Sequence, residues 1–422
     1  MNDPRTVLPL TSITTPADEA GVIEAICRAG ADRVPVYPLG GGTQLGFGAR
    51  PTEPGLGVSL AALRRVIDYP ARDLTITVEA GMTLAALGQC LAHENQRLPV
   101  DVPLPAQATV GGAVAAGAAG PRQFRWGTLR DYVIGLRAVD GTGMAFSAGG
   151  RVVKNAAGYD LCRLLTGSFG TLGVIVQVTL MVKPMPQASA FVVCELPDTH
   201  AAEKLLAQLV HTQTLPAAVE LLGGPAWQQD PELPPLSQHG ALRLLVGLEG
   251  SQAEVDWMIG RLQQEWRQAG VASPQVVAGA ATGPLWSRLT DFAASPPGGS
   301  LGALVVRIHV LPSAVISVVE GLRSIQPDVS FESHAGSGVV VARLTTGSMD
   351  LAGLIDGRLR PWVSQLGGYL AVLALPDGAS LSVQTLLGPP PPGSKTMHSI
   401  RQRFDPAGLL NRGRFHFALP AP

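Results

Sequence analysis

Three consecutive glycines are the residues of this chain best suited to bind a ligand. They lie in the stretch PLGGGTQLGFG, Pro38–Gly48, directly after the apolar run Val34–Tyr37. Residues without a Cβ atom can adopt positive φ angles and turn successive backbone N–H groups toward one anion. No Lys-Ser/Thr pair follows the glycines, as a Walker loop requires, and the spacing differs from G-x-G-x-x-G. The segment predicts a loop that holds a diphosphate without a metal; the alternative is a tight turn in a glycine-rich chain.

Two further segments combine glycine with very small residues. The first is PAQATVGGAVAAGAAG, Pro105–Gly120, and the second is KNAAGYDLCRLLTGSFGTLGVI, Lys154–Ile175. Residues this small let a backbone approach a flat ligand or another backbone closely. The segments therefore indicate either the walls of a cofactor site or close packing of helices on strands.

The order and wording of these segments carry a family resemblance. Together with RWGTLRD, Arg125–Asp131, they resemble the PCMH-type FAD-binding domain of the vanillyl-alcohol oxidase superfamily. Within that superfamily the chain is most similar to the E subunits of bacterial glycolate oxidases, which work with a related D subunit and an iron–sulfur F subunit. The resemblance extends from about Val34 to Lys183 and returns in FDPAGLLNRGRF, Phe404–Phe415.

The resemblance implies a function and partners. We expect an FAD-dependent oxidoreductase subunit that acts on the CH–OH group of 2-hydroxy acids, within a complex that oxidises glycolate to glyoxylate. Its partners would be the sister flavoprotein and the iron–sulfur subunit, and its flavin would relay electrons or support the catalytic subunit. Two alternatives stay open: an autonomous flavin oxidoreductase for another hydroxy acid or alcohol, and a non-catalytic flavin-binding scaffold.

The resemblance also implies which residues surround FAD, although it assigns no catalytic residue. Thr43 and Thr109 can donate hydroxyl hydrogen bonds to phosphate oxygens. Some superfamily members attach FAD covalently through a histidine at the position of Thr43, so non-covalent binding is expected here. The expected cofactor-binding residues are Leu39, Gly40, Gly41, Gly42, Thr43, Gln44, Thr109, Gly111, Gly112, Gly117, Gly173, Val174 and Ile175.

Two sets of polar residues near these segments each allow two interpretations. The first set could line the edge of the flavin ring or cap a helix that begins near Tyr159: Lys154, Asn155, Tyr159 and Asp160. The second set could touch the cofactor or form an exposed ion-pair cluster: Arg125, Arg130 and Asp131.

One segment of the C-terminal part departs from the family. Related 2-hydroxy-acid dehydrogenases carry an H-A-G-D-G-N-x-H segment whose histidines serve the substrate site. This chain has HAGSGVVVARL, in which His334 is kept while Ser337, Val339 and Val341 replace the acidic residue, the asparagine and the second histidine. Oxidation of a hydroxy acid needs a base for the hydroxyl proton and a group that holds the carboxylate. His334 is therefore interpreted as structural, and the chain alone is expected to oxidise hydroxy acids poorly.

Local patterns predict an α+β fold. A helix is expected from Thr15 as N-cap to about Gly30, and another over Thr83–Ala92. Ser251 and Glu254 form a capping box before an amphipathic helix. Strands are expected at 74–78, 132–138, 172–182, 191–196, 242–248, 304–311, 339–344 and 369–375.

This order of elements predicts three segments. Residues 1–185 are expected to form the FAD-binding domain of two α+β subdomains, and residues 186–393 a cap domain whose antiparallel sheet is covered by helices on one face. Residues 394–422 are expected to return toward the FAD domain.

Composition excludes several other classes of function. A net charge of −1 without a Lys/Arg cluster argues against a nucleic-acid surface. The four cysteines contain no C-x-x-C pair and the eight histidines have no metal-ligand spacing, so no metal site is predicted. No secretory signal and no transmembrane segment are recognised, so the protein is expected in the cytoplasm, with any membrane association made through its partners.

Overall fold

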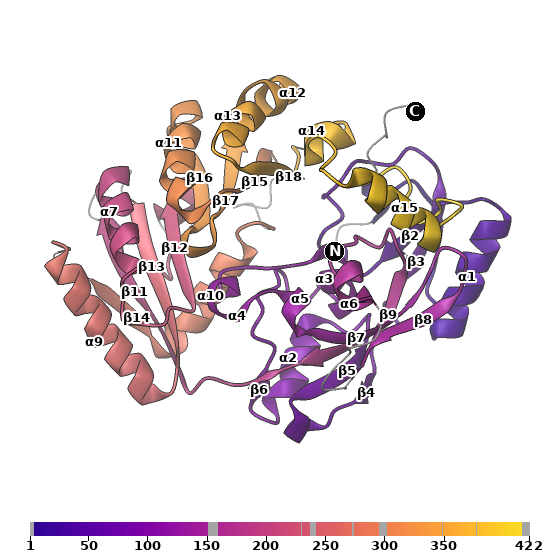
Figure 1. Cartoon of the computed structure of the whole chain (residues 1–422), viewed down its shortest axis with the longest axis horizontal. Helices are drawn as coiled ribbons and strands as arrows, with labels where there is room; N and C mark the ends of the chain where they lie inside the picture. Colours follow the sequence, from indigo (N-terminus) through magenta and orange to yellow (C-terminus); the bar gives the residue numbers. More distant parts are fainter. Residues whose placement is uncertain are drawn as a thin grey trace.

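The computed structural model describes residues 4–150, 159–228, 230–236, 242–271, 274–294, 302–347, 349–376 and 378–415. Lys154 and Asn155 lie outside these ranges. The fold is α+β, as predicted from the sequence. Figure 1 shows an N-terminal half, a C-terminal half built on one large sheet, and a C-terminal segment that lies against the N-terminal half.

The N-terminal half begins with a small parallel sheet in the order β1 (Leu10–Thr14), β3 (Gly55–Ser59), β2 (Val36–Leu39). Helix α1 (Glu19–Ala31) joins β1 to β2 and buries Val22 and Ile26. This helix begins later than predicted, because Asp18 rather than Thr15 is its N-cap. Asp18 has an extended backbone, and its carboxylate accepts a hydrogen bond from Gly21 N at 2.9 Å.

The second sheet of this half is antiparallel and five-stranded. Its strands lie in the order β4 (Val66–Asp68), β5 (Thr75–Glu79), β9 (Val174–Met181), β7 (Val133–Val139) and β8 (Ala145–Gly149). Its helices are α2 (Leu84–Ala92), α3 (Val110–Ala116), α4 (Gln123–Trp126), α5 (Leu129–Tyr132) and α6 (Leu161–Leu165). A separate antiparallel pair of short strands, β6 (Gln96–Arg97) and β10 (Lys183–Pro184), completes the N-terminal half. The predicted helix over 83–92 is confirmed, with Thr83 as its N-cap.

The C-terminal half contains one eight-stranded antiparallel sheet. The strands lie in the order β14 (Gln275–Ala278), β11 (Ala188–Leu196), β13 (Leu242–Gly250), β12 (Ala218–Gly223), β16 (Ser330–His334), β17 (Val339–Thr345), β15 (Ala303–His309) and β18 (Tyr369–Ala374). Strands β12, β14 and β16 were not predicted. Strand β12 has the short sequence AVELLG, in which Glu220 interrupts the apolar run although all six residues are buried.

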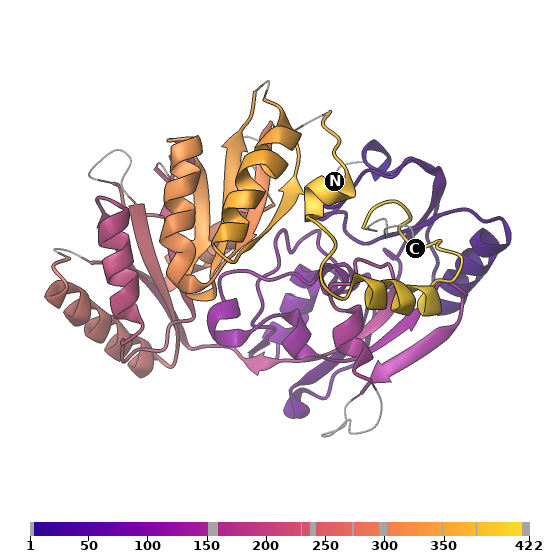
Figure 2. The same cartoon turned by 45° about the horizontal axis from the view of Figure 1, so that its top comes forward.

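The two faces of this sheet have different neighbours. Helices α7 (Thr199–Leu209), α9 (Gln252–Gln268), α11 (Val315–Ile325) and α13 (Arg360–Gln365) cover the outer face, where the largest hydrophobic cluster lies. Helix α10 (Thr282–Asp291) packs on the inner face, which is turned toward the N-terminal half (Figures 1 and 2). The predicted antiparallel sheet covered by helices is confirmed, but α10 lies on the second face, where no helix was expected. The capping box of Ser251 and Glu254 at α9 is confirmed as well.

A buried group of charges joins the two halves. Glu249, at the end of β13, accepts two hydrogen bonds from Arg97 at 2.6 and 2.8 Å and one from Arg122 Nε at 2.8 Å. Trp126 Nε1 donates to the same carboxylate at 3.1 Å, and Arg122 lies over the Trp286 ring of α10, 3.7 Å from its centroid. The contacts fix the inner face of the sheet against the N-terminal half.

The C-terminal segment returns to the N-terminal half. After the short helix α14 (Val383–Leu387), helix α15 (Ser394–Phe404) packs Phe404 on Phe146 with ring centroids 5.5 Å apart. The backbone beyond it forms a parallel bridge to β2, because Val36 N donates to Leu409 O and Asn411 N donates to Val36 O, each at 2.9 Å. The strand that leads into the glycine loop is thereby held by residues from the opposite end of the sequence.

Candidate functional site

The predicted cofactor-binding residues line two adjoining cavities. The larger, of about 570 Å³, is lined by Leu39 through Gln44 and Gly117 together with residues of the C-terminal half. The smaller, of about 110 Å³, is lined by the same glycine loop. The other predicted residues on its wall are Thr109, Gly111, Gly112, Gly173, Val174 and Ile175. Segments far apart in the sequence thus converge on one place.

The consecutive glycines serve two different purposes. Gly42 has φ of +76°, the left-handed conformation that the sequence argument expected of such residues. Gly41 lacks a positive φ; instead, a Cβ atom on it would lie 1.7 Å from Gln107 O. Only Gly42 therefore bends the loop by its conformation, whereas Gly41 is needed because two backbone segments approach closely.

Thr109 links the glycine loop to helix α3. It is the N-cap of α3, and its Oγ1 accepts a hydrogen bond from Gly112 N at 3.3 Å. A Cβ atom on Gly40 would lie 2.5 Å from the same Oγ1, so the loop and the helix start are in close contact. The hydroxyl proton of Thr109 remains available to a ligand oxygen, since the oxygen atom acts here as an acceptor.

The C-terminal motif FDPAGLLNRGRF supports the glycine loop from behind. Asp405 accepts hydrogen bonds from Leu409 N and Leu410 N at 2.8 and 2.9 Å. Arg414 Nη2 donates to Leu45 O at 2.7 Å and to Phe47 O at 2.6 Å. The motif stands out in the sequence, but these roles do not, because they depend on contacts with distant residues.

The charges around the two cavities favour an anionic ligand. Among the described residues that line them are Arg50, Arg307 and Arg414, and no aspartate or glutamate. Arg414 is 4% exposed, its Nε has no hydrogen-bond partner in the described chain, and burial lowers its pKa to about 10. Burial also lowers the pKa of Arg307, a lone charge on strand β15. An anion would offset the cost of burying these cations.

The structure shows what several residues do in the two polar sets that each allowed two interpretations. Asp160 caps helix α6 by accepting a hydrogen bond from Arg163 N at 3.0 Å, and Tyr159 is exposed. Arg125 donates to Glu249 O at 2.9 Å and to Leu215 O at 3.2 Å, and Asp131 closes a capping box with Thr128. Arg125 therefore joins the two halves, and its proposed exposed ion pair with Asp131 is not formed.

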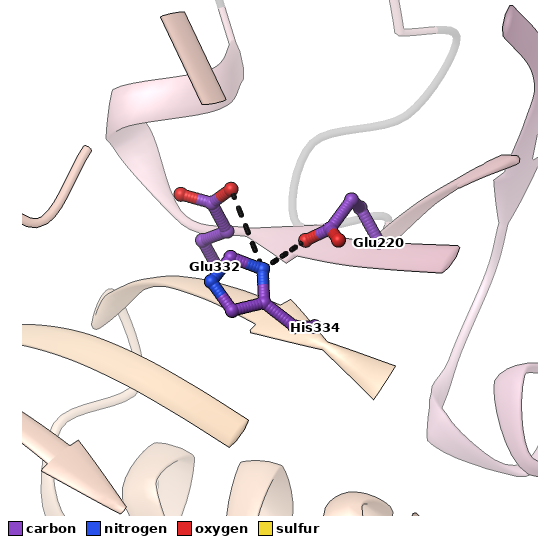
Figure 3. A group of neighbouring side chains, drawn as sticks. All are labelled: Glu220, Glu332 and His334. Atoms are coloured by element: carbon purple, nitrogen blue, oxygen red, sulfur yellow. Dashed lines mark hydrogen bonds and ion pairs between the residues drawn. The ribbon is translucent and has the colours of Figure 1, made fainter. Parts of the chain in front are cut away.

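His334 lies in a buried group rather than on a cavity wall. Its Nδ1 is 2.7 Å from Glu220 Oε2 and 4.0 Å from Glu332 Oε1, and Figure 3 shows both carboxylates directed at the same nitrogen. Burial raises the pKa of both carboxyl groups well above the usual value and lowers the pKa of His334. None of the three residues lines either cavity. Sequence spacing did not indicate the group, which adjacent strands bring together.

Comparison with known protein families identifies the cofactor. Residues 11–149 match the FAD binding domain, and residues 185–354 match the C-terminal domain of FAD linked oxidases. The two matched segments define an FAD-dependent oxidoreductase. The cavities described above fit this cofactor, because the glycine loop lines both of them and the wall of the smaller one carries the buried Arg414, whose Nε has no hydrogen-bond partner in the described chain.

The chain is similar to parts of two known proteins. The chain is 32% identical over 208 residues to glycolate oxidase subunit GlcD of Bacillus subtilis (strain 168), covering 49% of this chain and 44% of that protein. It is 37% identical over 169 residues to glycolate oxidase subunit GlcE of Escherichia coli (strain K12), covering 40% and 48%. The matched stretch is therefore less than half of each relative.

The fold agrees with that of a solved structure. The structure of alkyldihydroxyacetonephosphate synthase matches with a TM-score of 0.68 and 16% sequence identity, over 95% of this chain and 75% of that one. At this identity the match concerns the fold alone. Separately, no helix in the described part of the chain is long and apolar enough to cross a membrane.

Proposed function

We propose that this chain is the FAD-binding subunit of a glycolate oxidase or dehydrogenase complex that oxidises glycolate to glyoxylate. Its partners in this proposal are a sister flavoprotein subunit and an iron–sulfur subunit. The similarity to both GlcD and GlcE supports a member of this complex, and the family match over residues 11–149 includes the glycine loop.

One observation carries the proposal: the larger cavity lies between the glycine loop and the inner face of the C-terminal sheet. Gly40 to Gln44 form one wall, and Arg307 reaches the cavity from β15 on the other. Bound FAD supplies the two-electron redox chemistry. The guanidinium of Arg307 has no hydrogen bond or ion pair with another described residue, although the backbone is paired within the sheet, so it is available to hold the carboxylate of a 2-hydroxy acid or another anionic group.

Among the residues that the structure describes, none on the wall of this cavity could serve as a base for the substrate's hydroxyl proton. Its described wall contains no histidine, aspartate or glutamate, and His334 is buried elsewhere. Proton removal by a positioned base typically contributes about 10²–10⁴ in rate. This supports a role in which the chain binds and places FAD while the sister subunit supplies the catalytic base.

We assign the thirteen predicted residues as FAD contacts on the same grounds. Gly40, Gly41, Gly42 and Thr43 would hold the diphosphate, and Thr109 would donate its hydroxyl proton to it. The small residues near Gly117 and the start of β9 at Gly173–Ile175 would leave room for the rings. The described cavity walls contain no histidine or cysteine, which supports non-covalent binding.

Anaerobic stopped-flow spectroscopy tests the proposed subunit role. Glycolate should leave the flavin of the isolated chain oxidised over seconds, whereas dithionite should bleach it. Addition of the sister flavoprotein and the iron–sulfur protein should give glycolate-dependent bleaching and turnover. If glycolate bleaches the isolated chain rapidly, the chain is an autonomous oxidoreductase, the second function that Arg307 makes possible. A chain that binds flavin but adds nothing to partner activity is a scaffold.

A further inference from the structure

A third large cavity lies where the C-terminal segment meets both halves of the molecule. Its volume is about 820 Å³, which exceeds that of either flavin cavity. Its walls come from the end of α6 and the loop to β9 (164–172), from α13 and the start of β18 (360–370), and from the C-terminal segment (387–401), together with Phe47 and Phe415. Figure 1 shows α15 on the N-terminal half, beyond the chain that leads from α14. We call this space the C-terminal groove.

The C-terminal groove is largely apolar and reaches the surface. Pro389–Pro392 lie on its wall and are exposed. Met397 of α15 and Tyr369 of β18 also line it, and they are 56% and 50% exposed. Contiguous exposed apolar patches are uncommon on single chains and mark contact sites with other molecules. The described part of the chain therefore leaves a contact surface uncovered here.

The helix beside the groove is basic. Helix α15 contains Lys395, His398, Arg401 and Arg403 and no aspartate or glutamate, although the whole chain has a net charge of −1. Among the described residues that line the groove there is no acidic side chain either. An occupant with complementary charge is therefore acidic.

Two buried polar atoms on the wall have no hydrogen-bond partner in the described chain. They are Arg401 Nε and Ser168 Oγ. Arg401 Nη2 lies 3.8 Å from Asp405 Oδ2, an ion pair that leaves Nε without an acceptor. Buried donors in folded proteins are normally satisfied. A carboxylate or a backbone carbonyl of an occupant would supply the missing acceptor.

One layer of aromatic rings separates the groove from the flavin cavities. Phe47 lines the groove and the larger flavin cavity, Phe415 lines the groove and the smaller one, and Phe169 lines all three. The centroid of the Phe169 ring is 4.9 Å from that of Phe47 and 4.7 Å from that of Phe415. A protein seated in the groove would have only this layer between it and the flavin cavities, which suits a protein that receives electrons.

We propose that the C-terminal groove is the docking surface for the electron-accepting partner, which inserts an acidic segment with an apolar side chain. This inference rests on the proposed function, in which an iron–sulfur subunit is a partner of this chain. The basic helix would attract the acidic segment, and the apolar wall would bury its side chain. A protein segment fits better than a bilayer, because the apolar residues line a recess, whereas insertion into lipid needs an apolar face that projects from the surface.

The test measures binding of the purified iron–sulfur protein to the full-length, flavin-loaded chain by isothermal titration calorimetry. Met397→Glu places a negative charge at an exposed position of the groove, so the dissociation constant should rise at least about tenfold. Val210→Glu is the matched control, because Val210 is 80% exposed at the end of α7, far from α15 (Figures 1 and 2). It should bind like the unmodified chain. The affinity of the unmodified chain should fall as the salt concentration rises.

Cross-linking locates the contact on the chain. A zero-length carbodiimide joins a lysine amine to a carboxylate that touches it, so it should couple Lys395 of α15 to an acidic residue of the iron–sulfur protein. Lys395→Arg keeps the charge but removes the amine, so it should keep its affinity and lose this cross-link. Lys204→Arg on α7 should keep both. Peptide mass spectrometry can assign the link, because the chain has only four lysines: Lys154, Lys183, Lys204 and Lys395.

The outcomes separate this inference from the proposed function. A complex that forms with wild-type affinity in Met397→Glu and shows no cross-link from Lys395 would overturn the docking surface and leave the subunit role intact. Vesicles of phosphatidylcholine and phosphatidylglycerol that sediment the unmodified chain but not Met397→Glu would assign the groove to a membrane and also overturn it. If the unmodified chain does not bind the iron–sulfur protein, with or without the sister flavoprotein, both the proposed function and this inference are contradicted. Flavin content and circular dichroism check that each variant is folded, and the cross-link on the unmodified chain needs no variant.

Discussion

The glycine-lined cavities and the inner face of the C-terminal sheet lie near each other but are built differently. The cavities are shaped by backbone: Gly41 allows two segments to approach, and Gly42 turns the loop through a positive φ. The inner face is defined by side chains, with Glu220, Glu249 and Arg307 on three different strands. The cavities depend on residues that have no side chain. The inner face depends on side chains from neighbouring strands that the strand pairing brings together.

This difference determines how each region should respond to substitution. The glycine loop has no space or no suitable conformation for a larger residue at Gly41 or Gly42. A single substitution there should therefore abolish flavin binding. A side-chain site spreads its energy over several groups, so single changes should weaken it by measurable steps. Three substitutions test this contrast.

The largest effect is expected from Gly42→Val in the glycine loop. A β-branched residue at φ of +76° is strained, and Gly42 lies on the wall of both cavities. The purified variant should contain less than about one tenth of the wild-type flavin. Flavin is measured at 450 nm in the supernatant after acid precipitation, which should release all of it from the unmodified chain because Thr43 cannot form a covalent bond.

Gly46→Ala is the matched control for this substitution. Gly46 lies in the same loop, and a Cβ atom on it would meet nothing within 4 Å. It should keep wild-type flavin, and circular dichroism should show that both variants are folded. Wild-type flavin in Gly42→Val would mean that the loop does not hold the cofactor, and yellow colour left in the acid pellet would contradict non-covalent binding.

The same contrast explains what could be predicted from the sequence. The glycine loop, Thr109 and the 173–175 segment are continuous stretches of unusual composition, so their residue types alone suggest a common location. Arg307 and Glu220 are single charged residues inside apolar strands. A charged residue in an apolar stretch indicates a buried polar group, but it does not indicate which residues surround that group. Glu220 and His334 are 114 residues apart, and only the register of β12 on β16 makes them a pair.

The fold shows a similar division. Strands with clear boundaries, such as β11, β13 and β17, were predicted close to their observed limits. Strand β12 was missed because Glu220 interrupts its short apolar run, and β16 was missed because Glu332, Ser333 and His334 make it look like a polar loop. Glu332 and His334 lie on the inner face, which is turned toward the N-terminal half, whereas Ser333 on the outer face donates a hydrogen bond to Val339 O.

A smaller but substantial effect is expected from Glu249→Gln between the halves. Burial opposes ionisation of Glu249, but the hydrogen bonds from Arg97 and the charge of Arg122 outweigh it and lower its pKa to about 2. Removing this charge leaves Arg97 without its counter-ion, whereas Arg122 keeps its ion pair with Asp101. Breaking a buried pair in this way typically costs about 3–5 kcal/mol. The thermal unfolding midpoint at neutral pH should fall accordingly.

The pH dependence separates this effect from simple loss of packing. Because the pKa is lower in the folded state, the stabilisation by Glu249 is fully present above the usual pKa of about 4.5 and is lost as the pH falls toward 2. The difference between the unmodified chain and Glu249→Gln should therefore shrink over that range. Glu254→Gln, on the exposed start of α9, is the control and should change the midpoint little. A difference independent of pH would contradict the ionic explanation.

The smallest effect is expected from Arg307→Gln, which tests whether the side-chain wall of the larger cavity recognises anions. Small carboxylates such as oxalate or glycolate should perturb the flavin absorption spectrum of the oxidised, isolated chain when they bind beside the glycine loop. Loss of one charge-assisted hydrogen-bond donor costs about 1.5–3 kcal/mol, so the dissociation constant should rise at least about tenfold while flavin content stays unchanged.

Arg50→Gln is the control, since Arg50 lines the same cavity from an exposed position on the N-terminal half. Equal weakening in both variants would indicate a general electrostatic effect, and no weakening in Arg307→Gln would show that the anion binds without β15. A selective effect at Arg307 would mean that the inner face of the sheet takes part in ligand recognition, even though the described wall of the cavity contains no base for oxidation.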